Sequence, residues 1–510
     1  MTRIEEGKTT EKRFRRAAAA VKGPALHLPE GTRVPAGWSA VRIGAAGEEA
    51  LLQWSEAGEA SPLMPESGAV LRLCLALNMH QIKRVEARLG GGEPLGSLDI
   101  RYGYVFQPFE LQLTAAQAQA AVREGIVLWT SADTGPVWVF DSLGGAADKA
   151  FFAPHLLLED TATGGAAGSG RRERFLAAFL SLTSLQPFGW IEGCVLDGLY
   201  DLRPHVGARR ADDALDAHLS QYLDDHGRLR YEDLFSRPAD GRLTTIEATL
   251  PAGVLVKRDP GHPLIAAVIA YWASLEKEGL VMDGSIVTAE GAYTIAYPMA
   301  AAAVRLQRPA LAEQAVRQLL GRRDRLARGR DFYLRSADGG ARMTFRNWAR
   351  AWAWYLLGMT RTWTELTDGG LAGVAGLPEV EAELRRAAAA ALSWRGADRL
   401  WSCYLDDPAS GTETSGSAGI AAALALGARS GALPEAMAER ACETLNALTG
   451  YLSVDGVLHG VSQHNAGGDE LQRGGYRVYA QMGMGLLAQL DAALAGMPGM
   501  AAAAAEAWRR

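Results

Sequence analysis

The chain has 510 residues, of which 48% are hydrophobic and 22% charged, and its formal net charge is −6 at pH 7. This composition is that of a globular protein with ample core, and it excludes a largely disordered chain. A net negative charge gives no general attraction to phosphate backbones or anionic lipid, so we expect neither nucleic acid nor a membrane as a partner. The arginine-rich runs 171–174 and 322–325 are interpreted as solvated faces.

No segment has the character of a targeting or membrane-spanning sequence. The first thirty residues mix Glu, Lys and Arg, and no later stretch reaches the roughly 18 uninterrupted apolar residues of a membrane span. We therefore expect a cytoplasmic protein. Cys74, Cys194, Cys403 and Cys442 lack CxxC spacing, which argues against a disulfide framework or a zinc site and predicts buried thiols.

Between about Ser67 and Asp160 the chain consists of short apolar runs, such as AVLRLCLAL, IKRVEARL and IVLWTS, separated by Gly, Pro and Asp. Runs of this length between turn residues predict antiparallel strands. We expect residues 1–160 to form a β-sandwich-like domain with a flexible start. The Gly/Ala/Ser-rich stretch 161–171 is predicted to be a linker.

Beyond Arg171 the pattern changes to Ala-rich segments of about 12 to 20 residues with helical periodicity. About a dozen helices with short connections and no fixed-period repeat favour six antiparallel hairpins closed into a ring. The predicted fold is thus mainly α, an (α/α)6 toroid over residues 172–498. The Ala-rich tail 499–510 is expected to be a fraying helix. The predicted helices are 172–185, 188–202, 211–224, 246–257, 262–279, 290–306, 309–323, 344–366, 379–393, 412–429, 434–450 and 475–495.

Several loops and helix starts of this region are crowded with aromatic, acidic and small residues. They include FGWIEGCVLDGLYDL, NWARAWAW and LWSCYLDDPASGTETSGSAG. Aromatic faces stack on the apolar faces of pyranose rings, while carboxylates and amides bond the hydroxyls, so this mixture indicates a sugar site. For any one tryptophan, filling the core of the toroid remains an equal alternative.

The segment LWSCYLDDPASGTETSGSA (400–418), followed by an Ala-rich helix, resembles a motif of the unsaturated glucuronyl and rhamnogalacturonyl hydrolases, glycoside hydrolase families 88 and 105. FGWIEGCVLDGL (188–199) resembles their opening inner helix, and NWARAWAW (347–354) resembles their Trp-Ala-Arg-Gly-Asn-Gly-Trp segment. The resemblance covers about residues 172–495. It implies the six-hairpin toroid and an exo-acting enzyme that removes a terminal unsaturated uronic acid from an oligosaccharide.

The chain departs from the family pattern at several positions. Glu290 in EGAYTIAYP and Glu247 in EATLP stand where the family has shorter acids, and residues 351–353 replace its Gly-Asn-Gly. Arg335 in DFYLRSAD stands near the position of a family histidine. Glu247 and Glu290 are accordingly the catalytic candidates.

The resemblance implies that an acid protonates the C4=C5 bond of the unsaturated uronic acid and activates the water that adds to C5. Hydrolysis of a saturated glycoside instead needs two carboxyls that flank the bond. Glu247 and Glu290 suit either scheme, so a β-glucuronidase is the alternative. A catalytically inactive carbohydrate-binding protein is the alternative from another class. A polysaccharide lyase is disfavoured because its polymeric substrate normally requires export.

One of the two carboxyls must stay protonated near neutral pH, which burial or the neighbouring carboxylate favours, and the sequence does not tell which. Arg350 is the first candidate for the substrate carboxylate, because its planar fork makes two parallel bonds; an internal salt bridge is the alternative. Arg335, His464 and Arg477 are reserves.

The hydroxyls of Thr414, Ser415 and Ser417 suit the capping of a helix start, while Glu413 either binds sugar hydroxyls or props the loop. Asp283 in MDGS is a turn residue and a spare acid. We expect no cofactor and no metal, because the acids and histidine of HNAGGDELQ match no ligand spacing. A homodimer is left open. The candidate substrate-binding residues are Trp190, Glu192, Arg335, Trp348, Arg350, Trp354, Trp401, Glu413, Ser415, His464 and Arg477.

Overall fold

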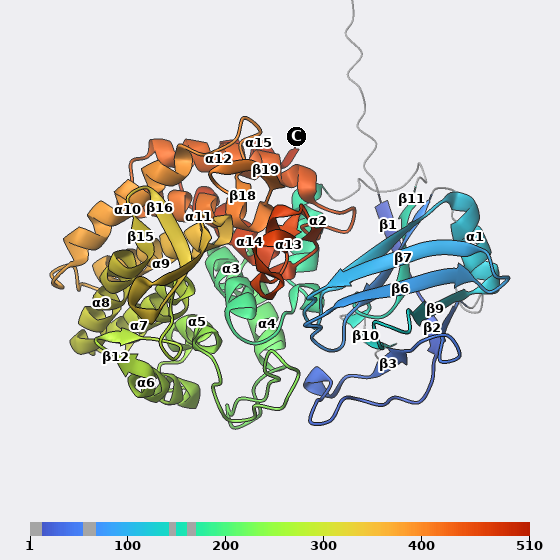
Figure 1. Cartoon of the computed structure of the whole chain (residues 1–510). Coiled ribbons are helices and arrows are strands. Elements are labelled where there is room, and N and C mark those ends of the chain that lie inside the picture. Colours follow the sequence, from blue (N-terminus) through green and yellow to red (C-terminus); the bar gives the residue numbers. More distant parts are fainter. Residues whose placement is uncertain (1–12, 55–67, 142–148, 161–169, 510) are drawn as a thin grey trace, which may run out of the picture.

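The computed structural model describes residues 13–54, 68–141, 149–160 and 170–509. The first three stretches carry the larger β-sheets, and the fourth carries nearly all the helices. The two parts lie side by side (Figure 1). The predicted linker falls almost entirely on 161–169, outside the described residues.

The N-terminal part is built from antiparallel sheets. One has the strand order β1-β11-β5-β8, a second has the order β2-β4-β9-β6-β7, and β3 pairs with β10. Exposed and buried residues alternate along β6, which explains its sequence period of two. The first four strands, from Arg13 to Gln53, precede the apolar runs from about Ser67 on which the β prediction rested. The strands are β1 Arg13–Ala18, β2 Ala20–Lys22, β3 Ala40–Ile43, β4 Ala50–Gln53, β5 Ala69–Cys74, β6 Ile82–Leu89, β7 Pro94–Arg101, β8 Pro108–Leu113, β9 Ile126–Thr130, β10 Val137–Phe140 and β11 His155–Asp160.

An aromatic cluster forms the core of this part. The ring of Trp38 lies 5.4 Å from Phe106, 5.2 Å from Phe140 and 5.3 Å from Phe152, between ring centroids. Helix α1 (Ala115–Glu124), which the sequence analysis did not predict, begins at a capping box formed by Thr114 and Gln117.

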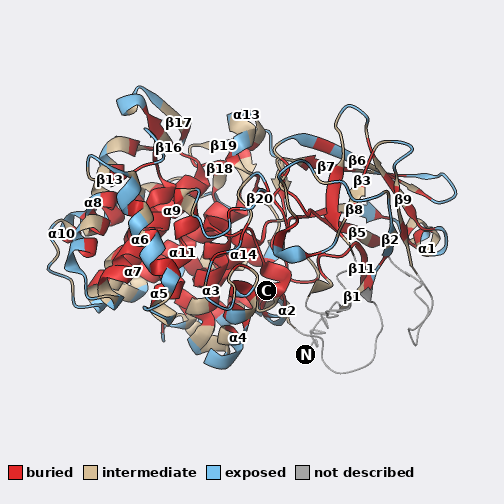
Figure 2. Cartoon of the chain, turned by 90° about the horizontal axis from the view of Figure 1, so that it is seen from below, coloured by how far each residue is buried: buried red, intermediate tan, exposed pale blue. Residues whose placement is uncertain are grey.

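Six inner helices form a closed ring in the second part. The order of contacts is α3, α5, α7, α9, α11, α14 and back to α3, and each inner helix packs on an outer partner. The buried residues concentrate along these inner helices (Figure 2). The predicted toroid is therefore observed. The inner helices are α3 Trp190–Val206, α5 Ala252–Arg258, α7 Tyr297–Arg305, α9 Ala349–Asp368, α11 Thr414–Ser430 and α14 Gln481–Ala495; their partners are α4 Ala208–Leu219, α6 Pro263–Leu275, α8 Pro309–Leu326, α10 Leu377–Leu392, α12 Ala436–Leu448 and α15 Ala501–Arg509.

Glycines let the inner helices approach closely. A Cβ atom at Gly485 of α14 would lie 2.4 Å from the carbonyl oxygen of Cys194 in α3, and one at Gly358 of α9 would lie 2.3 Å from the backbone of Ala292. No side chain fits at such distances, so small residues are required along the ring. None of the described helices combines the length and apolar character needed to cross a bilayer. All four cysteines are buried and free.

Several predicted helices need correction. The segment 262–279 ends in strand β12 (Glu276–Lys277), and the segment 475–495 begins with strand β21 (Arg477–Val478). The segment expected to begin at 344 starts as a strand, because Thr344 pairs with Arg335 in a β-hairpin, and α9 begins only at Ala349. The tail is a packed helix rather than a fraying one: Trp508 of α15 is buried, donates a 2.7 Å hydrogen bond to Asp491, and stacks on Phe175. The remaining elements are α2 Arg171–Phe179, α13 Gly468–Arg473, β12 Glu276–Lys277, β13 Leu280–Val281, β14 Val287–Thr288, β15 Ala327–Arg328, β16 Asp331–Ala337, β17 Arg342–Arg346, β18 Ser402–Tyr404, β19 Asp407–Thr412, β20 Val461–Ser462 and β21 Arg477–Val478.

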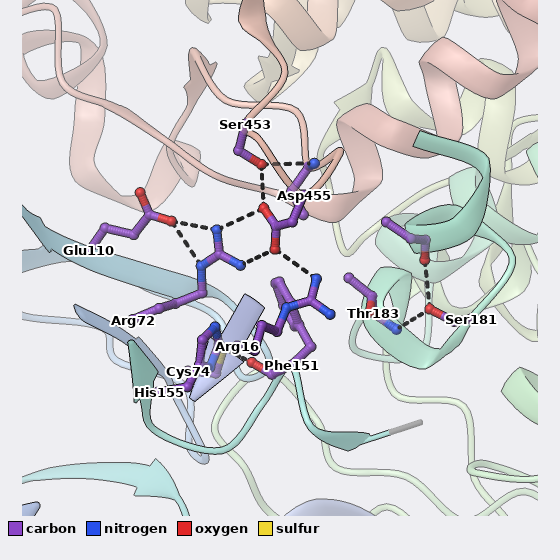
Figure 3. Close-up of polar contacts among 12 residues, drawn as sticks. Arg16, Arg72, Cys74, Glu110, Phe151, His155, Ser181, Thr183, Ser453 and Asp455 are labelled. Carbon is purple, nitrogen blue, oxygen red and sulfur yellow. Dashed lines mark hydrogen bonds and ion pairs between the residues drawn. The ribbon is translucent and has the colours of Figure 1, made fainter. Parts of the chain in front are cut away.

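A buried ion network joins the two parts (Figure 3). Arg72 of β5 donates to Glu110 of β8 and, at 2.6 Å, to Asp455 of the helical part, which also accepts a 2.7 Å bond from Arg16. Both Arg72 and Asp455 are buried, and the two guanidinium groups hold the pKa of the Asp455 carboxyl well below its usual range. Paired charges of this kind lose several kcal/mol when one partner is removed, so the β part is firmly docked on the ring.

Candidate active site

The starts of the inner helices bring the predicted site residues to one end of the ring. Glu247 lies on a short 3₁₀ turn (Ile246–Thr249) before α5, Glu290 precedes a π-helical turn (Ala292–Ala296) that leads into α7, and Glu413 is the N-cap of α11. The Ser462 amide, in the segment before α14, donates to Glu413, so the segments before the neighbouring helices α11 and α14 meet. A π-turn beside a buried acid is typical of functional sites.

Glu290 is a buried carboxyl with an altered affinity for protons. Its side chain is 3% exposed, and among the described residues one of its oxygens, Oε2, has no hydrogen-bond partner. Burial, and then the negative charge of Glu247, raises its pKa to about 7. Glu247 is partly exposed; burial, with a contribution from the charge of Asp283, raises its pKa as well. The two carboxyls are thus close enough to influence each other, and one holds its proton near neutral pH.

Arg335 lies on β16 beside both acids. Its positive charge lowers the pKa of Glu247 and of Glu290, and its side chain is partly exposed. Over the part of the chain that the structure describes, its guanidinium makes no hydrogen bond or ion pair. It is therefore available to an anionic group placed between it and the acids.

A second arginine packs behind Glu290. Arg322 is fully buried and donates to the carbonyl oxygens of Thr288, at 3.1 Å, and Val281, at 2.8 Å. A Cβ at Gly291 would lie 2.1 Å from this guanidinium, which explains the glycine next to the acid. The interpretation of 322–325 as a solvated face is wrong for Arg322, because its helix turns that side toward the core.

A small recess with a volume of about 20 Å³ adjoins Glu247. Trp190 and Phe188 line it from the start of α3, and the segment 231–245 supplies the other wall through Tyr231 and Leu234. This wall was not predicted from the sequence, because 231–245 carries neither periodicity nor a recognisable motif. Of the four candidate tryptophans, only Trp190 lines this pocket.

Three of the four candidate tryptophans surround Arg350. Its guanidinium carbon lies 4.5 Å from the ring centroid of Trp348, 5.6 Å from Trp190 and 5.8 Å from Trp354, and Trp348 and Trp354 are buried. Arg350 donates to the carbonyl oxygens of Ser462, at 2.9 Å, and of the next residue, at 2.8 Å. The two terminal nitrogens of Arg350 are therefore not directed at a substrate carboxylate, and Arg350 forms no salt bridge with an acid among the described residues. Arg350 instead anchors the loop after β20.

Three further candidates are bonded inside the protein. Glu413 accepts hydrogen bonds from the amides of Ser415 and Ser462 and from the Ser415 hydroxyl, so it caps α11 and props the loop. Arg477 donates to the carbonyl oxygens of Thr412 and Ser410, among others. The capping group is thus the Glu413 carboxylate rather than the hydroxyls expected for this role.

Of the remaining three candidates, Trp401 and Glu192 are buried and His464 is partly buried. Trp401 donates a 2.7 Å bond to the carbonyl of Ala391. Glu192 pairs with His218 at 2.7 Å. His464 packs edge-on against Tyr104 of the β part, and burial lowers its pKa to about 3. Among the described residues, no group of three or more His, Cys, Asp or Glu side chains is placed to hold a metal ion.

Comparison with known proteins gives the class of this molecule. Residues 291–494 match the family model described as Glycosyl Hydrolase Family 88. A solved structure described as a possible member of the GH105 family from Salmonella enterica is 16% identical, with a TM-score of 0.54, over 64% of this chain and 95% of that one. A family 105 glycoside hydrolase from C. acetobutylicum is 18% identical, with a TM-score of 0.52, over 63% of this chain and 97% of that one. No curated protein sequence matches the chain.

Residues 291–494 therefore resemble glycoside hydrolase family 88, and the resemblance predicted from the sequence is confirmed. The protein is an enzyme of the glycoside hydrolase class. The family match covers less than half of the 510 residues and begins one residue after Glu290. Glu247, Glu290 and the β part lie outside it, so their roles rest on the geometry described above.

Proposed function

We propose that the protein is an exo-acting hydrolase that removes a terminal unsaturated uronic acid from an oligosaccharide, with Glu290 as the acid. The observation that carries this proposal is that Glu247 and Glu290 lie close enough to alter each other's pKa, next to Arg335, whose guanidinium has no partner among the described residues, and beside a pocket. An unsaturated uronic acid brings an enol ether, which needs a proton donor, and a carboxylate, which needs a cation.

In this proposal the protonated carboxyl of Glu290 donates its proton to C4, and water adds to C5 as Glu247 or the newly formed Glu290 carboxylate takes up a proton. The resulting C5 hemiketal collapses, the ring opens, and the next sugar leaves. A pKa of about 7 keeps a substantial fraction of Glu290 protonated at neutral pH, as an acid of this kind requires. Arg335 pairs with the substrate carboxylate.

A β-glucuronidase acting on saturated ends is the second candidate. The specific observation in its favour is that two carboxyls, rather than one, are brought together. Direct hydrolysis uses such a pair as acid and nucleophile or base. An inactive binding protein is the third alternative, and the loss of turnover with retained binding in a Glu290→Gln variant would exclude it.

The decisive experiment compares two substrates side by side. Purified protein is incubated with an unsaturated uronyl disaccharide, followed by the loss of its enol-ether ultraviolet absorbance, and with an aryl β-glucuronide, followed by phenol release. Loss of absorbance with little phenol supports the hydration proposal. Phenol release with the unsaturated sugar untouched overturns it in favour of the glucuronidase.

We further infer that the antiparallel sheets of residues 13–160 pack as the predicted sandwich, since Trp38, Phe106, Phe140 and Phe152 share one core. The domain limits 1–160 and 172–498, the cytoplasmic location and a homodimer stay predictions.

A further inference from the structure

The segment 231–240, which forms one wall of the pocket, is held by the β part. The Arg33 guanidinium pairs with Glu232, at 2.6 Å, and with Asp240. The Asn78 side chain donates to the Ser236 hydroxyl, at 3.2 Å, and to the Asp233 carbonyl oxygen, at 3.4 Å. The β part and the segment lie against each other beside the ring (Figure 1). The β part therefore helps to build the mouth of the pocket.

The turn at the tip of this segment is rigid. The Asp233 carboxylate accepts from the amides of Phe235, at 2.8 Å, and Arg237, at 3.0 Å. Ser236 is buried with a φ of +61°, a conformation that non-glycine residues rarely adopt. Such strain persists only where the surroundings enforce it, and it is frequent at ligand sites.

This rigid turn presents an exposed aromatic ring. Phe235 is 60% exposed, the highest value for a large apolar side chain among the described residues. Its ring lies 4.8 Å from that of His80, whose Nε2 donates to the carbonyl of Leu234. Leu234 lines the same pocket as Trp190 and Glu247. The ring is thus fixed from behind by the β part at the edge of the candidate site.

We propose that Phe235, backed by His80, is a stacking platform for the sugar next to the terminal uronic acid, so that the β part sets a preference for saccharide aglycones. The proposal deepens the proposed function and rests on it for the substrate. An aromatic ring held on a preordered turn binds the apolar face of a pyranose without the loss of loop entropy. A terminal uronide with a small aglycone does not reach this platform.

The test compares Phe235→Ala with the wild type on two substrates, an unsaturated uronyl disaccharide and the methyl glycoside of the same unsaturated uronic acid. We expect KM for the disaccharide to rise about 10-fold and the kinetics of the methyl glycoside to change less than about 2-fold. Leu26→Ala, which removes another exposed side chain of the β part, is the matched control and should change neither. Asn78→Ala, which frees the turn while keeping the ring, should raise KM for the disaccharide alone.

Equal effects of Phe235→Ala on both substrates, or no effect on either, overturn the proposal. If the wild type consumes neither substrate, the proposed function fails, and the platform is then judged by calorimetric titration with a hyaluronan tetrasaccharide. Weaker binding by Phe235→Ala than by the wild type supports the platform. Equal binding, or no binding by the wild type, overturns it.

Discussion

The two sides of the ring mouth use their charged groups differently. On the side of α5 and α7, Glu290 has an oxygen without a partner, and the Arg335 guanidinium makes no hydrogen bond among the described residues. On the side of α11 and α14, Glu413 accepts several hydrogen bonds and Arg477 donates to surrounding carbonyl oxygens. Each side has an acid and an arginine, yet Glu413 and Arg477 are engaged in hydrogen bonds, whereas Glu290 and Arg335 have capacity left for a ligand.

This difference supports the proposal that Glu290 and Arg335, rather than Glu413 and Arg477, act on a substrate. A buried polar group that is fully bonded stabilises the fold, whereas one left unsatisfied costs stability and is retained where function needs it. Glu290 and Glu413 therefore form a natural pair for mutation, since both are buried carboxyls at the same mouth.

The largest effect is expected for chemistry at Glu290. Glu290→Gln should lower kcat about 1,000-fold, because the amide donates no proton, while saccharide binding is retained. Glu413→Gln at the other side is the control and should keep kcat within about 10-fold in the folded protein. The measurement is steady-state kinetics with a separate binding titration. Comparable losses of kcat in both variants would contradict the assignment of a catalytic role to Glu290 and a structural role to Glu413.

The same substitution should stabilise the protein at alkaline pH. The folded-state pKa of Glu290, about 7, lies above its ordinary value of 4.5, so the unfolded chain loses this proton first as the pH rises. The contribution of Glu290 to the unfolding free energy of the wild type is fully present below about pH 4.5 and is lost as the pH rises through 7. Glu290→Gln is neutral throughout and should exceed the wild type by up to about 3 kcal/mol at pH 8. Urea unfolding at pH 5 and pH 8 measures this; a difference independent of pH would argue against a buried, titrating Glu290.

The two arginines should differ in the kind of loss they cause. Arg335→Gln should raise KM for a uronyl substrate about 30-fold with little change in unfolding free energy, because it removes a partner of the substrate carboxylate. Arg350→Gln should instead lower stability, since its guanidinium holds the loop at Ser462 within a cage of tryptophans. Kinetics and thermal unfolding of both variants separate the two roles. An unchanged KM in Arg335→Gln would remove this residue from the site.

The smallest effect is expected on the unfolding free energy when the hydrogen-bonded carboxylate of Glu413 is replaced. Glu413→Gln should cost about 1 to 2 kcal/mol of unfolding free energy, because an amide nitrogen replaces one of the oxygens that cap α11. Chemical denaturation at neutral pH measures this loss. A variant as stable as the wild type would show that the cap is dispensable and would weaken the contrast with Glu290.

The amino-acid sequence by itself determined the change from strand to helix near Arg171, the positions of the inner helices and the acids that precede two of them. These features are local: periodicity, small residues and turn residues act over a few positions along the chain. The motif from 400 to 418 also indicated the enzyme class, which the family match over 291–494 confirmed.

Only the tertiary structure decided how each polar group is used. Arg350 and Arg335 look alike in the sequence, but one donates to carbonyl oxygens that lie more than a hundred residues away and the other faces two acids. The β part and the 231–240 turn meet across a similar separation, through Arg33, Asn78 and His80. Hydrogen-bond partners distant in the chain follow from how the ring closes and how the β part docks, and no local pattern of residues encodes them.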